Sequence, residues 1–195
     1  MTTFYLIRHA TNDYLNEQKI AGWLPGIHLN REGRQQAEHL ARRLSGEPIR
    51  AIYSSPLERA RETAEPLAGK LGLPVQISEG LGEIRFGDWT DRSIKELDAD
   101  PHWRRWNSFR SGTRAPQGDL MIEAQARIVG EMIRLRGEHP TAAVALVTHG
   151  DPIKAAVAYF LGTPLDSFLR IMVDPASVSI IALDEDAARV IRVNS

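Results

Sequence analysis

The chain of 195 residues contains no cysteine. This absence excludes disulfide bonds, thiolate-ligated zinc sites and cysteine nucleophiles. No apolar run approaches the roughly 20 residues that a membrane-spanning helix needs. The start of the chain also lacks the basic stretch and long apolar core of a signal peptide. We therefore expect a cytoplasmic protein with no membrane partner.

A strong excess of either charge is also missing. The chain has 24 Lys and Arg against 25 Asp and Glu, which gives a formal net charge of −1. No global field then favours nucleic acid, so we expect no nucleic-acid partner, and any recognition of anions has to come from local clusters. The length suits one well-packed domain, and we expect a single domain over residues 1–195.

Short apolar runs alternate with helical patterns along most of the chain. This alternation predicts a layered α/β domain with a largely parallel sheet. Asn30 and Gly46 bracket one helix as its N-cap and C′ residue, and Pro66 is expected to kink the next. The predicted strands are 3–7, 51–53, 74–77 and 142–148, with a hairpin of 177–183 and 190–193; the predicted helices are 31–45, 56–71, 93–98, 102–109, 119–138 and 152–161.

Polar side chains follow the predicted strands at the points where the strands end. Ligands of open α/β sheets bind beyond the carboxyl ends of the strands, so these side chains are candidates for one site. They are Arg8 and His9 after the first strand, Ser54, Ser55 and Arg59 after the second, and His149 and Gly150 after 142–148. The glycine-flanked loop around Glu83 could add a carboxylate.

The pair Arg8 and His9 points to a bound anion. Two cation-capable groups side by side at a buried strand end are costly without one. The planar fork of arginine suits phosphate oxygens, and a neutral imidazole can attack phosphorus. A helix N-terminus near Gly150 would add a partial positive charge.

Several ordered motifs now resemble one family. Residues LIRHA, AGWLPGIHLNREGRQQA, SSPLERARETA, GEIRFGDW and VTHG are similar to the motifs of the histidine phosphatase superfamily, also called the phosphoglycerate mutase-like family. The resemblance runs from about residue 4 to residue 161. It implies a three-layer α/β/α sandwich with a mostly parallel central sheet and a reaction without metal or cofactor.

The resemblance also implies roles for individual residues. His9 would be the nucleophile that becomes phosphorylated, and Glu83 would protonate the leaving group and then activate water. Two arginines and a cationic His149 would neutralise the transferred phosphoryl group, and the phosphate beside Glu83 should raise the pKa of that carboxyl. The phosphate pocket would comprise Arg8, Arg59, Asn12, Gly22 and Gly150 around His9 and His149.

The chain departs from the family pattern mainly around the substrate. Ala10 replaces the commoner glycine, and Asn12, Leu15 and Ala21 stand where Ser or Thr, Asn, and Ser or Thr are usual. GDLM, from Gly118, stands for a frequent G-E-S. The expected substrate is therefore a small phosphorylated metabolite of unspecified identity.

Alternative functions remain open on the sequence alone. A phosphoglycerate mutase-type transferase would use the same residues, but family mutases tend to carry a longer insertion after the general-acid loop. A phosphate-binding module without catalysis would not need Glu83. We therefore favour a metal-independent phosphomonoesterase, and the sequence does not indicate an oligomeric state.

The segment 101–114 allows two interpretations. It contains four arginines and no acidic residue, and its aromatics Trp103, Trp106 and Phe109 are spaced near one helical face. Either the aromatics pack inward while the arginines are solvated, or the segment forms a lid that contacts a second anionic group of the substrate. His28 is a candidate for the pocket mouth.

Overall fold

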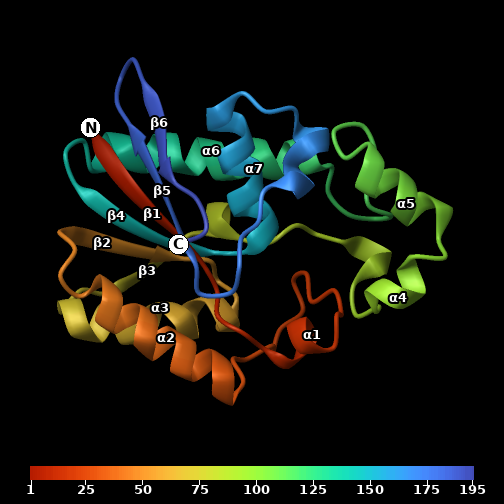
Figure 1. Ribbon diagram of the computed structural model, residues 1–195, viewed down its shortest axis with the longest axis horizontal. Helices are drawn as coiled ribbons and strands as arrows, with labels where there is room; N and C mark the ends of the chain where they lie inside the picture. The colour runs from red at the N-terminus through yellow and green to blue at the C-terminus, as the bar shows by residue number, and fades with distance from the viewer.

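The computed structural model describes residues 1–195, and its centre is a six-stranded sheet in the order β3-β2-β4-β1-β5-β6 (Figure 1). The first four strands of that order are parallel, whereas β5 runs antiparallel to both β1 and β6. The predicted mostly parallel sheet is thus confirmed. The strands are β1 (Thr2–Arg8), β2 (Ile49–Ser54), β3 (Val75–Ile77), β4 (Ala143–Thr148), β5 (Val178–Leu183) and β6 (Ala188–Arg192).

The strands β1 and β4 lie at the middle of this sheet. All six residues of β4 are buried. Such a strand has both faces covered, which is why its sequence is a continuous apolar run instead of an alternating one. The hairpin strand β5 covers the other edge of β1, so β1 has a hydrogen-bonded neighbour on each side.

Helices cover both faces of the sheet and complete the predicted three layers (Figure 1). On one face lie α2 (Arg31–Leu44) and α3 (Glu58–Leu71), and on the other lie α6 (Met121–Glu138) and α7 (Gly150–Leu161). Leu40 and Leu67 pack with Ile7 on the first face. Ile128 and Val157 pack with Leu146 on the second. The predicted N-cap Asn30 is confirmed, because its side chain accepts a hydrogen bond from Gly33 N at 2.9 Å.

A separate group of short elements lies between β3 and α6. It contains η1 (Glu79–Leu81), η2 (Gly87–Trp89), α4 (Ile94–Leu97) and α5 (Pro101–Ser108), and η3 (Leu165–Arg170) packs nearby. Figure 1 shows α4 and α5 standing out beyond the layered body. A third hydrophobic cluster holds this region together; it includes Phe86, Trp89, Trp103, Trp106 and Phe168.

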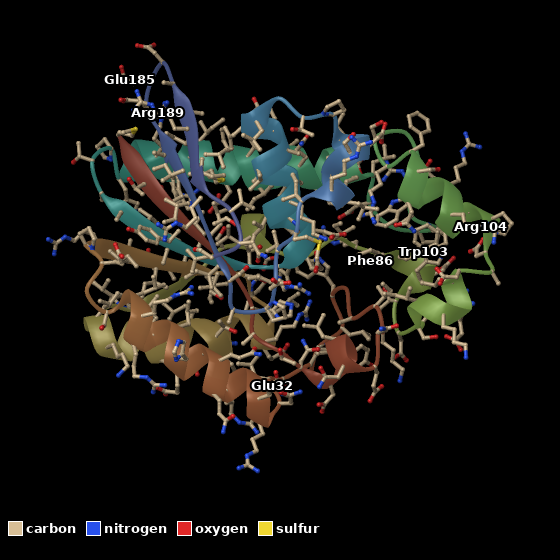
Figure 2. The ribbon with its side chains drawn as sticks, in the orientation of Figure 1. Glu32, Phe86, Trp103, Arg104, Glu185 and Arg189 are labelled. Carbon is tan, nitrogen blue, oxygen red and sulfur yellow. The ribbon has the colours of Figure 1, made fainter.

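The side chains of α5 are sorted by face. Trp103 and Trp106 are buried and their rings stack at 5.3 Å, as the packing interpretation predicts. Figure 2 shows Arg104 at the outer edge of α5, with Trp103 and Phe86 on the side toward the rest of the molecule. The inclusion of Phe109 in the buried face is wrong, because the helix ends there and the side chain is 46% exposed.

Other differences from the predicted elements are local. The expected loop after the first strand contains a short helix, α1 (Asp13–Asn16), capped by the side chain of Asn12. The helix α7 starts two residues before the predicted Pro152, because Pro152 is accommodated within its first turn. The helix α3 starts at Glu58 instead of residue 56 and continues through Pro66 to Leu71, the predicted end. The second hairpin strand starts at Ala188 instead of Val190, and Glu185 and Arg189 mark the hairpin tip (Figure 2).

None of the helices combines the length and the apolar character that crossing a bilayer requires.

Candidate active site

Strand register brings the two predicted histidines together. Arg8 in β1 is the register partner of Thr148 in β4, so the residues that follow, His9 and His149, lie side by side beyond the strand ends. Their ring centroids are 5.1 Å apart, with the rings edge to face. Both side chains are almost completely buried, at 4% and 0% exposed.

The His9 ring is held in one tautomer by its own neighbour. Its Nδ1 lies 2.8 Å from the carbonyl oxygen of Ala10. A carbonyl only accepts hydrogen bonds, so Nδ1 carries the proton and Nε2 keeps its lone pair. Burial first, and then the charges of Arg59 and Arg8, lower the pKa of His9 well below its usual value. The ring is therefore neutral, with a free lone pair on Nε2.

Two arginines flank these rings and are anchored by main-chain carbonyls. Arg8 Nη1 donates to Val173 O at 2.6 Å, and Arg59 Nη2 donates to Gly22 O at 2.8 Å. These bonds leave Arg8 Nε and both Nε and Nη1 of Arg59 buried without a hydrogen-bond partner. Buried donors normally have partners, so these nitrogens mark the place of an anionic ligand.

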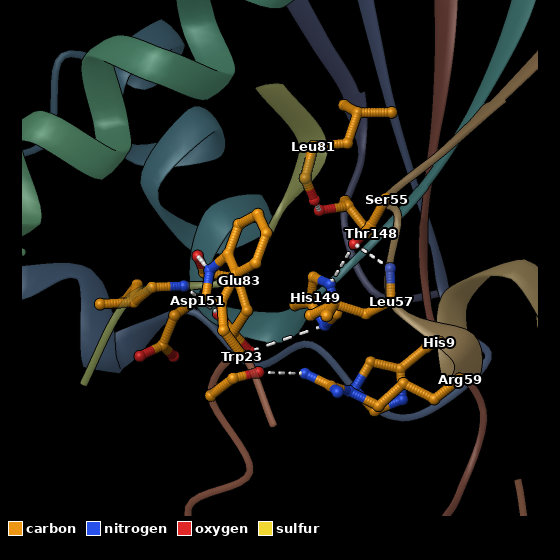
Figure 3. A network of polar contacts seen from close by, with 12 residues as sticks. His9, Trp23, Ser55, Leu57, Arg59, Leu81, Glu83, Thr148, His149 and Asp151 are labelled. Atoms are coloured by element: carbon orange, nitrogen blue, oxygen red, sulfur yellow. Dashed lines mark hydrogen bonds and ion pairs between the residues drawn. The ribbon is translucent and has the colours of Figure 1, made fainter. Parts of the chain in front are cut away.

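Glu83 contributes the carboxyl group, from the loop that follows η1. Its Oε2 lies 3.8 Å from His149 Nδ1, and its Oε1 accepts from the N–H of Ile84 (Figure 3). Its pKa is raised to about 7, chiefly by burial and next by the negative charge of Asp151. A raised pKa of Glu83 was predicted with a bound phosphate as its cause. Here burial and the charge of Asp151 raise the pKa without a phosphate.

His149 is the innermost member of the group. Its Nε2 lies 2.8 Å from Ser55 Oγ, and its Nδ1 is buried without a hydrogen-bond partner. Leu57 N–H donates to Ser55 Oγ, which leaves the hydroxyl proton available for His149 Nε2. Burial and the charge of Arg59 lower the pKa of His149 well below its usual value. His149 is thus neutral without a ligand, and the predicted cationic form stays a prediction for the phosphate-bound state, because a bound dianion would favour the cation.

The remaining predicted residues each have a definable place. Gly150 is the first residue of α7, and a Cβ atom there would lie 3.2 Å from Arg8 Nε, so glycine leaves room for that guanidinium. Gly22 has a φ of +49° and supplies the carbonyl that holds Arg59. Asn12 accepts from Leu15 N through Oδ1, which leaves its Nδ2 group as the donor for a ligand.

Most of these side chains surround one cavity of about 450 Å³. Arg8, His9, Arg59 and Glu83 line its inner end, together with the predicted residues Asn12, Gly22 and Gly150. His149 is fully buried beside the His9 ring and does not line the cavity. The structure therefore brings together the residues that the sequence analysis assigned to catalysis and to the phosphate pocket.

The outer end of the cavity holds residues that the sequence analysis did not assign. Arg110 is 4% exposed; its guanidinium stacks 3.7 Å from the Trp106 ring and donates to Asp151 Oδ2 at 3.1 Å. Lys154 Nζ lies 3.6 Å from Asp151 Oδ1, and Asn107 Oδ1 accepts from Arg110 at 2.7 Å. The outer end therefore presents two cations around one carboxylate.

Some sequence signals for these residues existed. Arg110 belongs to the acid-free segment 101–114, but nothing in the pattern separates it from Arg104 and Arg114, which bind Asp98 O and the Glu123 carboxylate instead. Ser55, a predicted candidate, contacts His149 and does not line the cavity. The prediction that His28 lies at the pocket mouth is wrong, because His28 does not line the cavity and pairs with Glu62.

No group of three or more His, Asp or Glu side chains is arranged to hold a metal ion.

Comparisons with known proteins agree on one family. The sequence-family model of the histidine phosphatase superfamily (branch 1) matches residues 4–195. Phosphoserine phosphatase 1 of Hydrogenobacter thermophilus is 30% identical over 196 residues, which cover 100% of this chain and 92% of the relative. The 2,3-bisphosphoglycerate-dependent phosphoglycerate mutase of Thermoplasma acidophilum is also 30% identical, over 92% of this chain and 86% of that protein.

A solved structure gives the same result in three dimensions. A mutant phosphoserine phosphatase from Entamoeba histolytica in complex with phosphoserine superposes with a TM-score of 0.92. It is 26% identical, and the match covers 100% of this chain and 98% of that one. The chain, with its two facing histidines at adjacent strand ends, belongs to the histidine phosphatase superfamily (branch 1).

Proposed function

We propose that this histidine phosphatase hydrolyses phosphomonoesters of small metabolites through a phosphohistidine intermediate, without a metal ion or cofactor. His9 is the nucleophile and Glu83 is the general acid and base. Arg8, Arg59 and His149 bind the transferred phosphoryl group. The single observation that carries the proposal is the set of buried, unpartnered nitrogens of Arg8, Arg59 and His149 around the His9 ring.

In the first half-reaction, His9 Nε2 attacks phosphorus and the bond between phosphorus and the ester oxygen breaks. The guanidinium groups and His149 stabilise the charge on the equatorial oxygens, which is the main requirement of phosphoryl transfer. The leaving oxygen takes the proton of Glu83, whose pKa of about 7 keeps a protonated fraction at neutral pH. The products are the free alcohol and phosphorylated His9.

In the second half-reaction, water replaces the alcohol. The Glu83 carboxylate accepts a proton from the water as the water oxygen attacks phosphorus. The bond between phosphorus and Nε2 breaks, which releases inorganic phosphate and restores His9 and protonated Glu83. Throughout, the hydrogen bond from Nδ1 to Ala10 O keeps Nε2 as the only reactive nitrogen of the ring.

The outer end of the cavity supports a substrate that carries a carboxylate. Arg110 and Lys154 are cations there, and Asp151 between them suits a hydroxyl or ammonium group of the same leaving group. A relative and a solved structure are named for phosphoserine, which has both groups. We place small phosphorylated hydroxy or amino acids first among the substrates.

A mutase activity is the second candidate, because a relative named as a phosphoglycerate mutase matches with the same identity as the phosphatase. The short connection between the Glu83 loop and α6 favours hydrolysis. An inactive binding module is disfavoured because it would not need Glu83. The family match to residues 4–195 supports the proposal of a single domain.

Trapping of the phosphoenzyme tests the proposal. Protein mixed with a phosphate ester and quenched in alkali is expected to carry an acid-labile phosphate on His9, and His9→Ala is expected to lose it. His39→Ala, an exposed histidine of α2, is the matched control and should keep it. Label retained in His9→Ala would overturn the assignment of the nucleophile. Activity lost with a chelator and restored by a divalent metal would overturn the metal-free mechanism.

A further inference from the structure

The main-chain carbonyl of Glu83 receives two hydrogen bonds from side chains of distant elements. Trp23 Nε1 donates to Glu83 O at 2.5 Å, and Arg127 Nη2 donates to the same oxygen at 2.9 Å. Trp23 comes from the loop after α1, and Arg127 comes from the middle of α6. The two available lone pairs of one carbonyl are therefore both occupied.

Both donors lie outside the cavity. Neither Trp23 nor Arg127 is among the residues that line it. They contact the main-chain oxygen of Glu83 outside the cavity. The carboxyl of Glu83, in contrast, lines the cavity and is close to His149 (Figure 3). A contact of this kind cannot bind substrate, and it can only act by placing the residue that does.

The donors belong to a closed set of contacts around the loop. Arg127 lies 3.8 Å from Asp119 Oδ2, and that same oxygen accepts from the N–H of Arg85. The Arg85 guanidinium lies over the Trp23 ring, 4.4 Å from its centroid. The contacts thus run from Trp23 through Glu83 O, Arg127, Asp119 and Arg85 back to Trp23.

The residue before Glu83 is adapted to this arrangement. A Cβ atom on Gly82 would lie 2.2 Å from the Trp23 ring and 3.1 Å from Arg127 Nη1. A contact of 2.2 Å does not occur between non-bonded atoms, so any side chain at position 82 would displace the ring. Glycine therefore lets the indole and the guanidinium reach the carbonyl together.

We propose that Trp23 and Arg127 are positioning residues that hold the Glu83 carboxyl at the leaving-group oxygen by fixing the main-chain carbonyl of Glu83. This inference rests on the proposed role of Glu83 as general acid. A displacement of about 1 Å in a reacting group can lower a rate by about 100-fold. The loss should therefore appear in the proton-transfer step and not in phosphate binding.

Leaving-group dependence measures that step. An aryl phosphate releases a stable phenolate and needs little protonation, whereas an alkyl phosphate needs a full proton from the acid. We expect Trp23→Phe and Arg127→Met to lower kcat for an alkyl phosphate by about 10- to 100-fold. We expect a much smaller loss with p-nitrophenyl phosphate and little change in KM. Arg127→Lys, which keeps a donor, should recover part of the alkyl activity.

Matched controls separate positioning from general damage. Trp89→Phe removes an indole N–H that donates to Asp100, at 3.3 Å, in the aromatic cluster. Arg134→Met removes an arginine of α6 that pairs with Glu131 and Glu138 on the surface. Both controls should leave the ratio of alkyl to aryl activity unchanged. Melting temperatures of all variants show whether a loss of activity reflects unfolding.

The outcomes distinguish the two proposals. Equal losses with alkyl and aryl substrates in Trp23→Phe and Arg127→Met, with Glu83→Gln still selective for the leaving group, would overturn the positioning role alone. No leaving-group selectivity in Glu83→Gln itself would overturn the role of the general acid, and the positioning role with it. A selective loss in all three variants supports both.

Discussion

The two ends of the cavity are built in different ways. Most of the inner end consists of residues at the ends of β1, β2 and β4 and at the N-termini of the helices that follow, and Glu83 is added from the loop after η1. The outer end combines Asp151 and Lys154 of α7 with Asn107 of α5 and with Arg110, whose guanidinium packs on a hydrophobic cluster that is separate from the two clusters flanking the sheet. The groups that would act on the phosphoryl group, which all substrates share, thus lie mostly at the strand ends. The groups that would contact the variable part of the substrate lie at the outer end.

The largest expected effect is at the inner end. Arg59→Met removes a buried cation next to His9, and we expect kcat/KM to fall by about 10³-fold for every phosphate ester. The fall should not depend on the leaving group, because the phosphoryl group is common to all substrates. Steady-state assays with an aryl ester and a phosphorylated carboxylic acid check this. A loss confined to one substrate would contradict the division of the cavity.

The second effect concerns Glu83, the carboxyl group at the inner end. Glu83→Gln removes the proton donor, and we expect kcat for alkyl phosphates to fall by about 10²-fold, the lower end of the usual contribution of general acid catalysis. Aryl phosphates should lose less. The slope of rate against leaving-group pKa, measured over a series of esters, should become steeper. An unchanged slope would remove Glu83 from the role of the acid.

A smaller effect is expected at the outer end. Arg110→Lys keeps the charge but loses the planar fork stacked on Trp106. We expect KM for phosphorylated carboxylic acids to rise by about tenfold, as one weakened charged contact would give. The value for p-nitrophenyl phosphate should barely change. Arg105→Lys, in the preceding helix α5 and outside the cavity, is the control. Equal rises for both substrates would place Arg110 outside substrate recognition.

The smallest effect concerns pH. The negative charge of Asp151 helps to raise the pKa of Glu83 to about 7, so activity on alkyl phosphates should fall as the pH rises through about 7 and Glu83 loses its proton. Asp151→Asn removes that charge and stabilises the ionised carboxyl. The falling limb should therefore move to lower pH. A pH profile of kcat/KM measures the shift; a move to higher pH would reverse the assigned cause.

The inner end was predictable from the sequence because its residues follow apolar strands within recognisable motifs. Parallel strands bring their carboxyl ends to one edge, so Arg8, His9, Arg59 and His149 could be grouped before the structure was known. The residue roles remain predictions that the experiments above address. The fold followed for the same reason, since buried strands and amphipathic helices carry strong periodic patterns.

The outer end was not predictable at the same level. The packing of Trp106 and Phe168 around the guanidinium of Arg110 directs that side chain into the cavity. No local pattern in 101–114 reveals such a tertiary contact. The neutral state of His149 in the unliganded site was not predictable either, because its burial depends on the complete fold. The donors Trp23 and Arg127 meet at Glu83 only once α6 has packed on the acid loop.

The register pairing of Arg8 with Thr148 has a further consequence for how misfolding would inactivate this protein. Side chains alternate between the two sides of a strand, so a slip of one residue between β1 and β4 would turn one imidazole to the opposite side of the sheet. Such a misfolded chain could keep most of its secondary structure and yet have no turnover. Enzymatic activity in this protein is therefore a sensitive reporter of correct strand alignment during refolding, more so than circular dichroism or compactness.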